Sequence, residues 1–308
     1  MNKKIALTGG TGFVGAALIN AFLDGGAEIK ALARTPSKLS DWKDRVSIVE
    51  GDINNPDALG QLAQGCDIFI HCAGVTHVRD DDDFHAINVD GAKEAARAAA
   101  NAGAKMVHLS SMSAREPSLS PYAASKRASE AAVAEANAIS LRLPAIYGLR
   151  DTATLPYFKL VKAGLAPEPA TQSPARASIL FVEDAAAAVA RAADAALTPG
   201  VYEVADDRPQ GYSWTEIGET LGAVMGKKPR KIRAPRPILS GYHAVARRAA
   251  LLMGKTPDVR TGQIREFFHT DWVARDPLFN DAASWAPAHS LKEGFAKTVQ
   301  WYQEHGYL

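Results

Sequence analysis

Apolar residues along the first half of the chain follow two patterns in turn. Short apolar runs predict strands at residues 5–7, 28–33, 46–50, 67–71, 105–110 and 140–143. Apolar residues three or four apart predict helices through Leu18, Ile19 and Phe22, from Pro56, from Phe84 to Asn101, and from Pro121. Such alternation is typical of a doubly wound parallel α/β sheet, which binds ligands at the carboxyl ends of its strands.

Beyond residue 148 the alternation becomes irregular, and prolines mark a loop-rich stretch near residues 167–174. Residues 179–182, an alanine-rich helix to residue 197 and residues 201–204 are expected to return to the main sheet. Further helices are predicted near residues 214–225, 237–252, 261–270 and 290–305. We therefore expect a larger domain of residues 1–147 and 178–206, and a smaller, mostly helical domain of residues 148–177 and 207–308.

The first predicted strand ends in the glycine-rich turn Thr8-Gly9-Gly10-Thr11-Gly12-Phe13-Val14-Gly15. Glycine lets the backbone turn sharply and approach a ligand closely, because it has no Cβ. The helix that follows begins with unpaired N–H groups and the positive end of its dipole, which suit a pyrophosphate. At the end of the first strand of a βαβ unit, this spacing predicts a dinucleotide site.

Composition indicates a globular protein with a large core, and it carries no information about the substrate. The 308 residues are 47% hydrophobic, enough for a large core, and the net charge of +1 gives no overall attraction to nucleic acid or membrane. Cys66 and Cys72 are predicted to be buried thiols, no His/Cys cluster has zinc spacing, and no metal site is expected. Only three apolar residues separate Lys4 from Thr8, too few for a signal peptide, and no run approaches transmembrane length, so we expect a cytoplasmic protein.

A set of three residues, at the end of the fifth predicted strand and in the helix that follows it, carries candidate catalytic chemistry. Tyr122 and Lys126 are four residues apart and therefore share one face of a helix. A free tyrosine has a pKa of about 10, and a neighbouring lysine favours the phenolate, so this pair predicts an acid/base group. Ser111 ends the adjoining strand, where its hydroxyl can donate to a substrate oxygen.

Together with Leu141-Arg142-Leu143-Pro144-Ala145-Ile146-Tyr147-Gly148, these motifs resemble the extended short-chain dehydrogenases/reductases. This is the NAD-dependent epimerase/dehydratase family, which includes nucleotide-sugar epimerases and enzymes similar to dihydroflavonol reductase and 3β-hydroxysteroid dehydrogenase. The resemblance covers nearly the whole chain and implies a Rossmann domain followed by a smaller substrate domain. Residues 145–147 and Phe181 are expected to line or support a substrate cleft between the two.

The resemblance also implies roles for individual residues. Tyr122 would be the catalytic acid/base, Ser111 would polarise the reacting carbonyl or alcohol, and Lys126 would bind the nicotinamide ribose and lower the pKa of Tyr122. Asp52 would reach the adenine. The full set expected to hold the cofactor is Gly9, Thr11, Gly12, Phe13, Val14, Arg34, Lys38, Asp52, Ile53, Ala73, Gly74, Lys126 and Pro144.

Two features depart from the family pattern. Ser111 and Tyr122 are closer in sequence than in the sugar-nucleotide epimerases, and the usual tyrosine-glycine after the serine is missing. At the end of the second predicted strand, NAD-binding proteins place an acid for the ribose hydroxyl. This chain has no acid between Lys30 and Lys38, but has Arg34 and Lys38 there, which predicts NADP(H) rather than NAD(H).

Residues 227–236 carry six positive charges and no acid. This segment permits contact with an anionic substrate or a membrane surface. We favour the simpler interpretation, in which a solvated connector precedes a core helix at residues 237–252.

The leading functional prediction is an NADP(H)-dependent oxidoreductase that moves a hydride between the nicotinamide and a ketone or secondary alcohol. A nucleotide-sugar epimerase or dehydratase, which uses the cofactor transiently, stays open. So does a non-catalytic dinucleotide-binding subunit like the one in respiratory complex I, although the intact set Ser111, Tyr122 and Lys126 favours an enzyme. We expect a small-molecule substrate, no nucleic acid, and leave a homodimer open.

Overall fold

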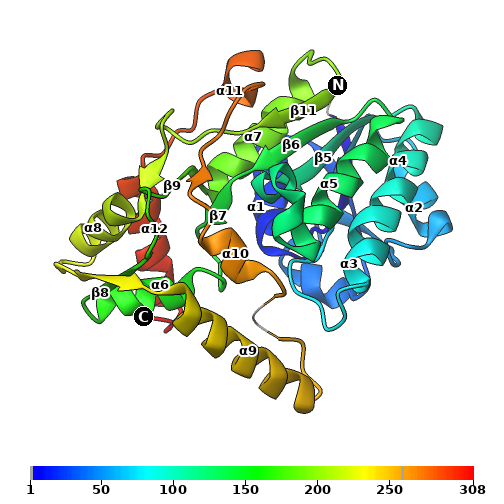
Figure 1. Cartoon of the computed structure of the whole chain (residues 1–308). Coiled ribbons are helices and arrows are strands. Elements are labelled where there is room, and N and C mark those ends of the chain that lie inside the picture. Colours follow the sequence, from blue (N-terminus) through cyan, green and yellow to red (C-terminus); the bar gives the residue numbers. More distant parts are fainter. Residues whose placement is uncertain (1–2, 258–259) are drawn as a thin grey trace.

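The computed structural model describes residues 3–257 and 260–308. A seven-stranded sheet forms its centre, with the strand order β11-β6-β5-β4-β1-β2-β3 and parallel pairing throughout (Figure 1). The strands are β1 (Lys4–Thr8), β2 (Glu28–Ala33), β3 (Val46–Glu50), β4 (Ile68–His71), β5 (Lys105–Ser111), β6 (Ile139–Leu143) and β11 (Gly200–Glu203). The predicted doubly wound Rossmann sheet is thus confirmed.

Helices cover both faces of this sheet, which explains why its strands are continuously apolar. On one face lie α1 (Phe13–Asp24) and α7 (Val182–Asp194), and on the other α2 (Pro56–Ala63), α4 (Gly91–Ala102) and α5 (Pro121–Ala134). Alternate residues of one strand enter opposite cores: Ile68 and Ile70 join the α1 face, whereas Phe69 joins the α4 face. We call the sheet and these helices the sheet region.

The predicted helix from Phe84 to Asn101 is less regular than its sequence pattern indicates. It consists of a short turn α3 (Asp83–His85), a π-helical turn (Ala86–Asp90) and α4, which ends at Gly103 in the left-handed conformation. The π turn brings Asn88 into the interior, where its side chain is 2% exposed. The irregularity therefore has a local consequence for the site described below.

A second set of elements lies beside the carboxyl edge of β6. It comprises β7 (Ala145–Tyr147), α6 (Leu155–Lys162), β8 (Leu165–Pro169), β9 (Arg176–Ala177), β10 (Ile179–Phe181), β12 (Tyr212–Ser213), α8 (Trp214–Val224), β13 (Arg230–Ala234), α9 (Arg236–Leu252), α10 (Gln263–Phe267), β14 (Asp271–Trp272) and α12 (Leu291–Glu304), whereas the short helix α11 (Phe279–Ala282) packs into the core of the sheet region. Its core is aromatic, with Phe158 against Phe295 and Tyr302. We call these elements the helical region.

One predicted strand lies elsewhere than expected. Residues 200–203 do return to the main sheet beside β6, but Ile179–Phe181 pairs with β7 in a separate two-stranded sheet. Pro144 interrupts the chain directly after β6, so β7 leaves the main sheet and β10 follows it. The assignment of residues 179–182 to the main sheet was therefore wrong.

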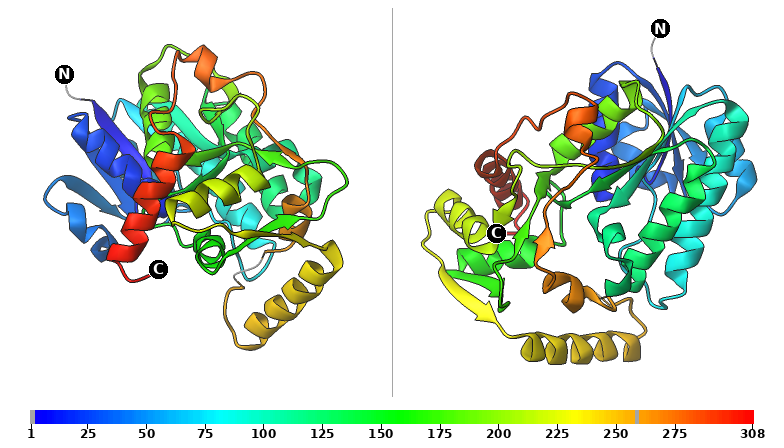
Figure 2. Two further views of the ribbon diagram at one scale, coloured as in Figure 1. Left: turned by 90° about the vertical axis from the view of Figure 1, so that its left-hand side faces the viewer. Right: turned by 45° about the horizontal axis from the view of Figure 1, so that its top comes forward.

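For residues 227–252, the helix and the exposure of the basic segment are confirmed, but the expectation that the helix belongs to the core was wrong. The basic segment forms the exposed strand β13, which pairs with β8, and the helix that follows contains no buried residue. In both views of Figure 2, α9 lies at the periphery, away from the sheet. Within residues 3–257 and 260–308, none of the helices combines the length and the apolar character needed to cross a bilayer.

Candidate functional site

The glycine-rich turn joins β1 to α1, and its shape depends on missing side chains. Gly9 has a φ of 77°, and a Cβ there would lie 2.6 Å from the backbone nitrogen of Ala73. A Cβ at Gly15 would lie 2.0 Å from the carbonyl oxygen of Gly9, so α1 can sit against the turn only with glycine at this position.

The amino end of α1 is open toward solvent. Thr11 and Gly12 are exposed, Phe13 and Val14 are half-buried, and no described side chain caps the helix at Gly12. By contrast, Asn55 caps α2 and Ser120 caps α5 with side-chain hydrogen bonds. The free N–H groups of α1 therefore fit the pyrophosphate of a dinucleotide.

Charged side chains flank the end of β2, where an adenosine ribose would lie. Arg34 follows β2 with a side chain 79% exposed, and its Nε lies 3.9 Å from the carboxylate of Asp52. Lys38 is also exposed, whereas Ile53 is buried and packs against Gly91. The long ion pair leaves the Arg34 guanidinium accessible to an anion.

Asn88 connects the loop after β4 to helix α5, which carries Tyr122. Its carboxamide accepts a hydrogen bond from the backbone of Val75 at 2.8 Å and donates to the Ser125 hydroxyl at 2.9 Å. A Cβ at Gly74 would lie 3.1 Å from its Oδ1. The sequence analysis assigned no role to Asn88.

The structure brings Ser111, Tyr122 and Lys126 together at the carboxyl end of β5. Tyr122 is half-buried near the start of α5, and the Ser111 side chain is close enough to lower its pKa. Lys126, one turn later, is buried, and its Nζ donates to the carbonyl oxygen of Leu109 at 2.7 Å. Pro144 is buried beyond the neighbouring strand β6.

The electrostatics of Tyr122 differ from the expectation. Burial raises the pKa of Tyr122, while Arg260 and the hydrogen bond from Ser111 oppose that rise. The cation over its ring is Arg260, whose guanidinium carbon lies 4.7 Å from the ring centroid. The expected lowering of this pKa by Lys126 was wrong, because the Lys126 ammonium points instead toward Leu109.

Arg260 and its partner Glu266 come from far along the chain, and the sequence contained no signal for either. Glu266 is buried, forms an ion pair with Arg260 and accepts a hydrogen bond from Ser120 at the start of α5. It also accepts one from Ser113 at 3.3 Å. The helical region thus completes the surroundings of Tyr122.

A row of buried polar side chains crosses the sheet behind Lys126. Thr8, His71, His108 and Ser140 are in register on β1, β4, β5 and β6. Thr8 bonds His71 at 3.0 Å, Ser140 bonds His108 at 3.1 Å, and the two imidazoles stack with centroids 5.7 Å apart. Burial, reinforced by Lys126, lowers the pKa of His71 to about 3 and that of His108 well below its usual value, so both are neutral at pH 7.

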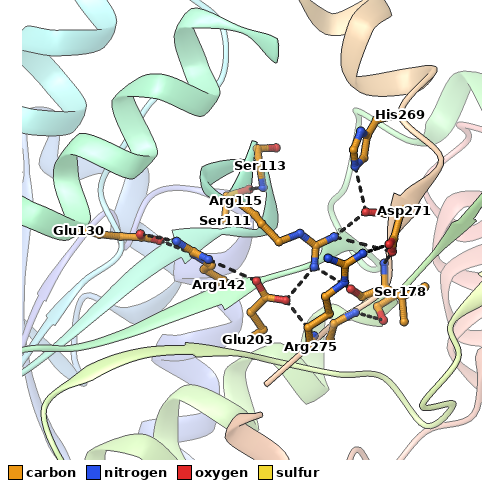
Figure 3. A network of polar contacts seen from close by, with 12 residues as sticks. Ser111, Ser113, Arg115, Glu130, Arg142, Ser178, Glu203, His269, Asp271 and Arg275 are labelled. Carbon is orange, nitrogen blue, oxygen red and sulfur yellow. Dashed lines mark hydrogen bonds and ion pairs between the residues drawn. The ribbon is translucent and has the colours of Figure 1, made fainter. Parts of the chain in front are cut away.

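A ladder of buried charges links the sheet to the segment that carries Glu266 (Figure 3). Arg142 donates twice to Glu130, each time at 2.8 Å, and reaches Glu203 at 3.3 Å. Glu203 also accepts from Arg115 at 3.0 Å, and Arg115 donates to the carbonyl oxygen of Val273 at 2.8 Å. Because these charges are paired, and Glu130, Arg142 and Glu203 are buried, they hold residues 271–275 against the edge of the sheet.

Comparison with known proteins identifies the family. The family model described as "NAD dependent epimerase/dehydratase family" matches residues 5–205. A ceramide reductase of Caulobacter vibrioides is 42% identical over 311 residues, which cover 99% of this chain and 96% of the relative. A putative dihydroflavonol 4-reductase of Synechocystis is 24% identical, over 98% of this chain and 95% of the relative.

Solved structures share the fold. The Bordetella bronchiseptica enzyme WbmG in complex with NAD superimposes with a TM-score of 0.74 at 20% identity, covering 100% of this chain and 96% of WbmG. UDP-glucose 4-epimerase of Thermotoga maritima has a TM-score of 0.74 at 16% identity, with 99% of both chains covered. The predictions of an extended short-chain dehydrogenase/reductase, of an oxidoreductase and of a nicotinamide dinucleotide as cofactor are confirmed. The chain belongs to the NAD-dependent epimerase/dehydratase family.

Proposed function

We propose that this chain is an NADP(H)-dependent reductase that converts a ketone of a long-chain, ceramide-type lipid into a secondary alcohol. The observation that carries the chemistry is the placement of Ser111, Tyr122 and Lys126 at the carboxyl end of β5, on the same edge of the parallel sheet as the open amino end of α1. The lipid class rests on the full-length similarity to a ceramide reductase, at 42% identity.

The residues present fit a bound dinucleotide, which would supply a hydride to the carbonyl carbon. Gly9, Gly12 and the start of α1 would hold the pyrophosphate, and Ala73 and Gly74 would border the cofactor. Lys126 would bind the nicotinamide ribose through its ammonium group.

Tyr122 would donate the proton that the carbonyl oxygen takes up. Its raised pKa keeps the phenol protonated at neutral pH, which suits the direction of reduction. Ser111 would donate a hydrogen bond to the same oxygen as negative charge develops on it. Arg260 would stabilise the phenolate left behind, because its guanidinium already lies over the ring.

The preference for NADP(H) rests on Arg34 and Lys38. Both are exposed at the end of β2, where a 2′-phosphate would lie, and both carry the positive charge that a phosphate requires. Asp52, on the other side of Arg34, would reach the adenine.

The substrate would lie between the two parts of the chain. We assign residues 1–147 and 178–206 to cofactor binding, and residues 148–177 and 207–308 to the substrate. Tyr147 and Phe181 would support the cleft from beneath rather than line it, because both are buried, with ring centroids 5.7 Å apart.

The test is NADPH oxidation by the purified protein with a ceramide-type ketone in detergent, a short-chain ketone and UDP-glucose. We expect turnover of the ceramide-type ketone, weaker turnover of the short-chain ketone and none of the sugar nucleotide. Turnover of UDP-glucose without net NADPH oxidation would instead establish an epimerase or dehydratase. NADPH binding without turnover of any of the three would contradict an enzymatic function in this substrate range.

A further inference from the structure

Helix α9 presents an apolar stripe to solvent along its full length. Ile238, Tyr242, Val245, Leu252 and Met253 are between 62% and 81% exposed. Together with exposed Ala249, they are spaced i, i+4, i+7, i+11, i+14 and i+15, which places them on one face of the helix. Large apolar side chains at this spacing normally form the buried face of a helix, so this stripe needs a partner.

The opposite face of α9 already packs against the rest of the protein. Leu239, His243, Ala246, Ala250 and Leu251 are half-buried, and their spacing places them on the other side of the helix. Arg247, on the same side, pairs with Asp81 at 3.6 Å. The helix is therefore held to the body of the protein by one face, and its apolar stripe points outward.

The surroundings of the stripe are strongly basic. Residues 227–257 contain nine Lys and Arg residues and no Asp or Glu. Arg236, Arg248 and Lys255 are exposed on or just after α9. On the strand that leads into it, Arg230 is exposed as well, while Lys231 forms an exposed ion pair with Glu219 at 3.1 Å. An apolar stripe flanked by positive charge is typical of a helix that lies in the surface of an anionic bilayer.

We propose that α9 docks this protein on an anionic lipid surface, with the apolar stripe at the headgroup–acyl boundary and the basic residues among the headgroups. A second copy of this chain fits the stripe poorly, because two copies would bring like charges together without an acid between residues 227 and 257. An anionic bilayer offers both an apolar interior for the stripe and negatively charged headgroups for the basic residues.

The position of α9 suits this partner. Its 17 residues give a length of about 25 Å, and it lies at the edge of the molecule in Figure 2. Arg260, which follows α9 in the sequence, lies over the Tyr122 ring. Docking through α9 would therefore place a lipid surface next to the segment that carries Arg260. The inference goes beyond the proposed function and needs no particular substrate.

The experiment is sedimentation of the full chain with vesicles of phosphatidylcholine containing phosphatidylglycerol, compared with vesicles of phosphatidylcholine alone. We expect binding to the anionic vesicles, and weaker binding at high salt. The double variant Val245→Glu/Leu252→Glu should reduce the partition coefficient by about tenfold or more, because each change removes a large apolar contact and adds an anion. The matched control is Leu160→Glu, which places the same charge on an apolar side chain 41% exposed on α6 and should bind as wild type does.

A second pair of variants isolates the contribution of charge. Arg248→Glu/Lys255→Glu should weaken binding to the anionic vesicles, whereas Lys43→Glu/Arg45→Glu, equally exposed but far along the chain, should not. Unchanged circular dichroism and NADPH binding would show that each variant is folded, as expected for a helix without buried residues.

Equal binding of wild type and Val245→Glu/Leu252→Glu would overturn the proposal, as would no binding of wild type to anionic vesicles. A wild-type dimer that this variant converts into a monomer, without vesicle binding, would assign the stripe to a second copy. Because sedimentation uses no substrate, its outcome is independent of NADPH oxidation, and the two proposals can fail separately.

Discussion

Helices α7 and α9 are both rich in alanine and both contain arginine, yet one is buried and the other is not. In α7, alanines and valines pack against α1 and the sheet, and eight of its residues are buried. In α9 no residue is buried, although its apolar side chains are larger. Small side chains let α7 approach the sheet closely, whereas the apolar stripe of α9 has no complementary surface within the described chain. Burial is thus decided by what faces a helix rather than by its composition.

The same contrast extends to polar groups. Behind Lys126, the buried hydroxyls and imidazoles of the sheet region are paired with one another. Around α9 and the segment after it, the buried atoms Arg247 Nη1 and Arg260 Nε have no hydrogen-bond partner among the described residues. The polar row inside the sheet is thus satisfied, whereas the buried polar atoms without a partner in the described chain lie outside it, and they also include Asp81 Oδ1, Arg115 Nε and Tyr157 Oη. Four predictions sharpen or break this distinction.

The largest expected effect lies where the two regions meet. Tyr122→Phe removes the proton donor but keeps the ring, so turnover of the ketone should fall by about 10²–10⁴-fold while NADPH binding is retained. Steady-state kinetics and NADPH titration of the same preparation measure both. A variant that binds NADPH normally and turns over within a few-fold of wild type would remove Tyr122 from the mechanism.

The next effect is on stability. Glu203→Ala leaves Arg115 and Arg142 without their shared partner in the interior, and should lower the free energy of unfolding by about 3–5 kcal/mol. Glu219→Ala is the control, because its ion pair with Lys231 is exposed and should contribute about 0–1 kcal/mol. Urea denaturation compares them, and equal losses would mean that the buried ladder is no more important than a surface pair.

A smaller effect is expected in cofactor selection. Arg34→Ala removes a charge-assisted contact worth about 1.5–3 kcal/mol, so NADPH affinity should fall by roughly 10- to 100-fold while NADH affinity changes little. Arg45→Ala, also exposed, is the matched control. Fluorescence titration with both cofactors decides the matter, and tighter binding of NADH than NADPH by wild type would refute the preference.

The most gradual effect is a dependence of stability on pH. His71 has a pKa of about 3 when folded and about 6.5 when unfolded, so between these values the unfolded chain binds more protons. Stability therefore decreases as pH falls below 6.5, by at most about 1.4 kcal/mol per pH unit for this residue. Thermal melting of wild type and His71→Gln should show a shallower acid dependence in the variant, and identical slopes would exclude His71 as a cause.

Much of the sheet region was predictable because its signals are local. Each strand is an apolar run with its own turn, and the glycines at positions 9, 12 and 15 must be close in space because they are close in sequence. The spacing of Tyr122 and Lys126 likewise placed both on one helical face. The pairing of Ile179–Phe181 with β7 instead of the main sheet was not predictable in this way. Strand pairing depends on which other strands lie nearby in the folded chain, and no local pattern gives that.

The sequence by itself determined the doubly wound sheet, the open amino end of α1 and the grouping of Ser111, Tyr122 and Lys126. Periodicity, turn chemistry and helical spacing act over a few residues and leave visible patterns. Only the tertiary structure decided that Arg260 lies over Tyr122, that Glu203 joins two arginines, and that α9 leaves its apolar stripe exposed. These features join segments that are far apart in the chain, or depend on a missing neighbour, and no local pattern records either.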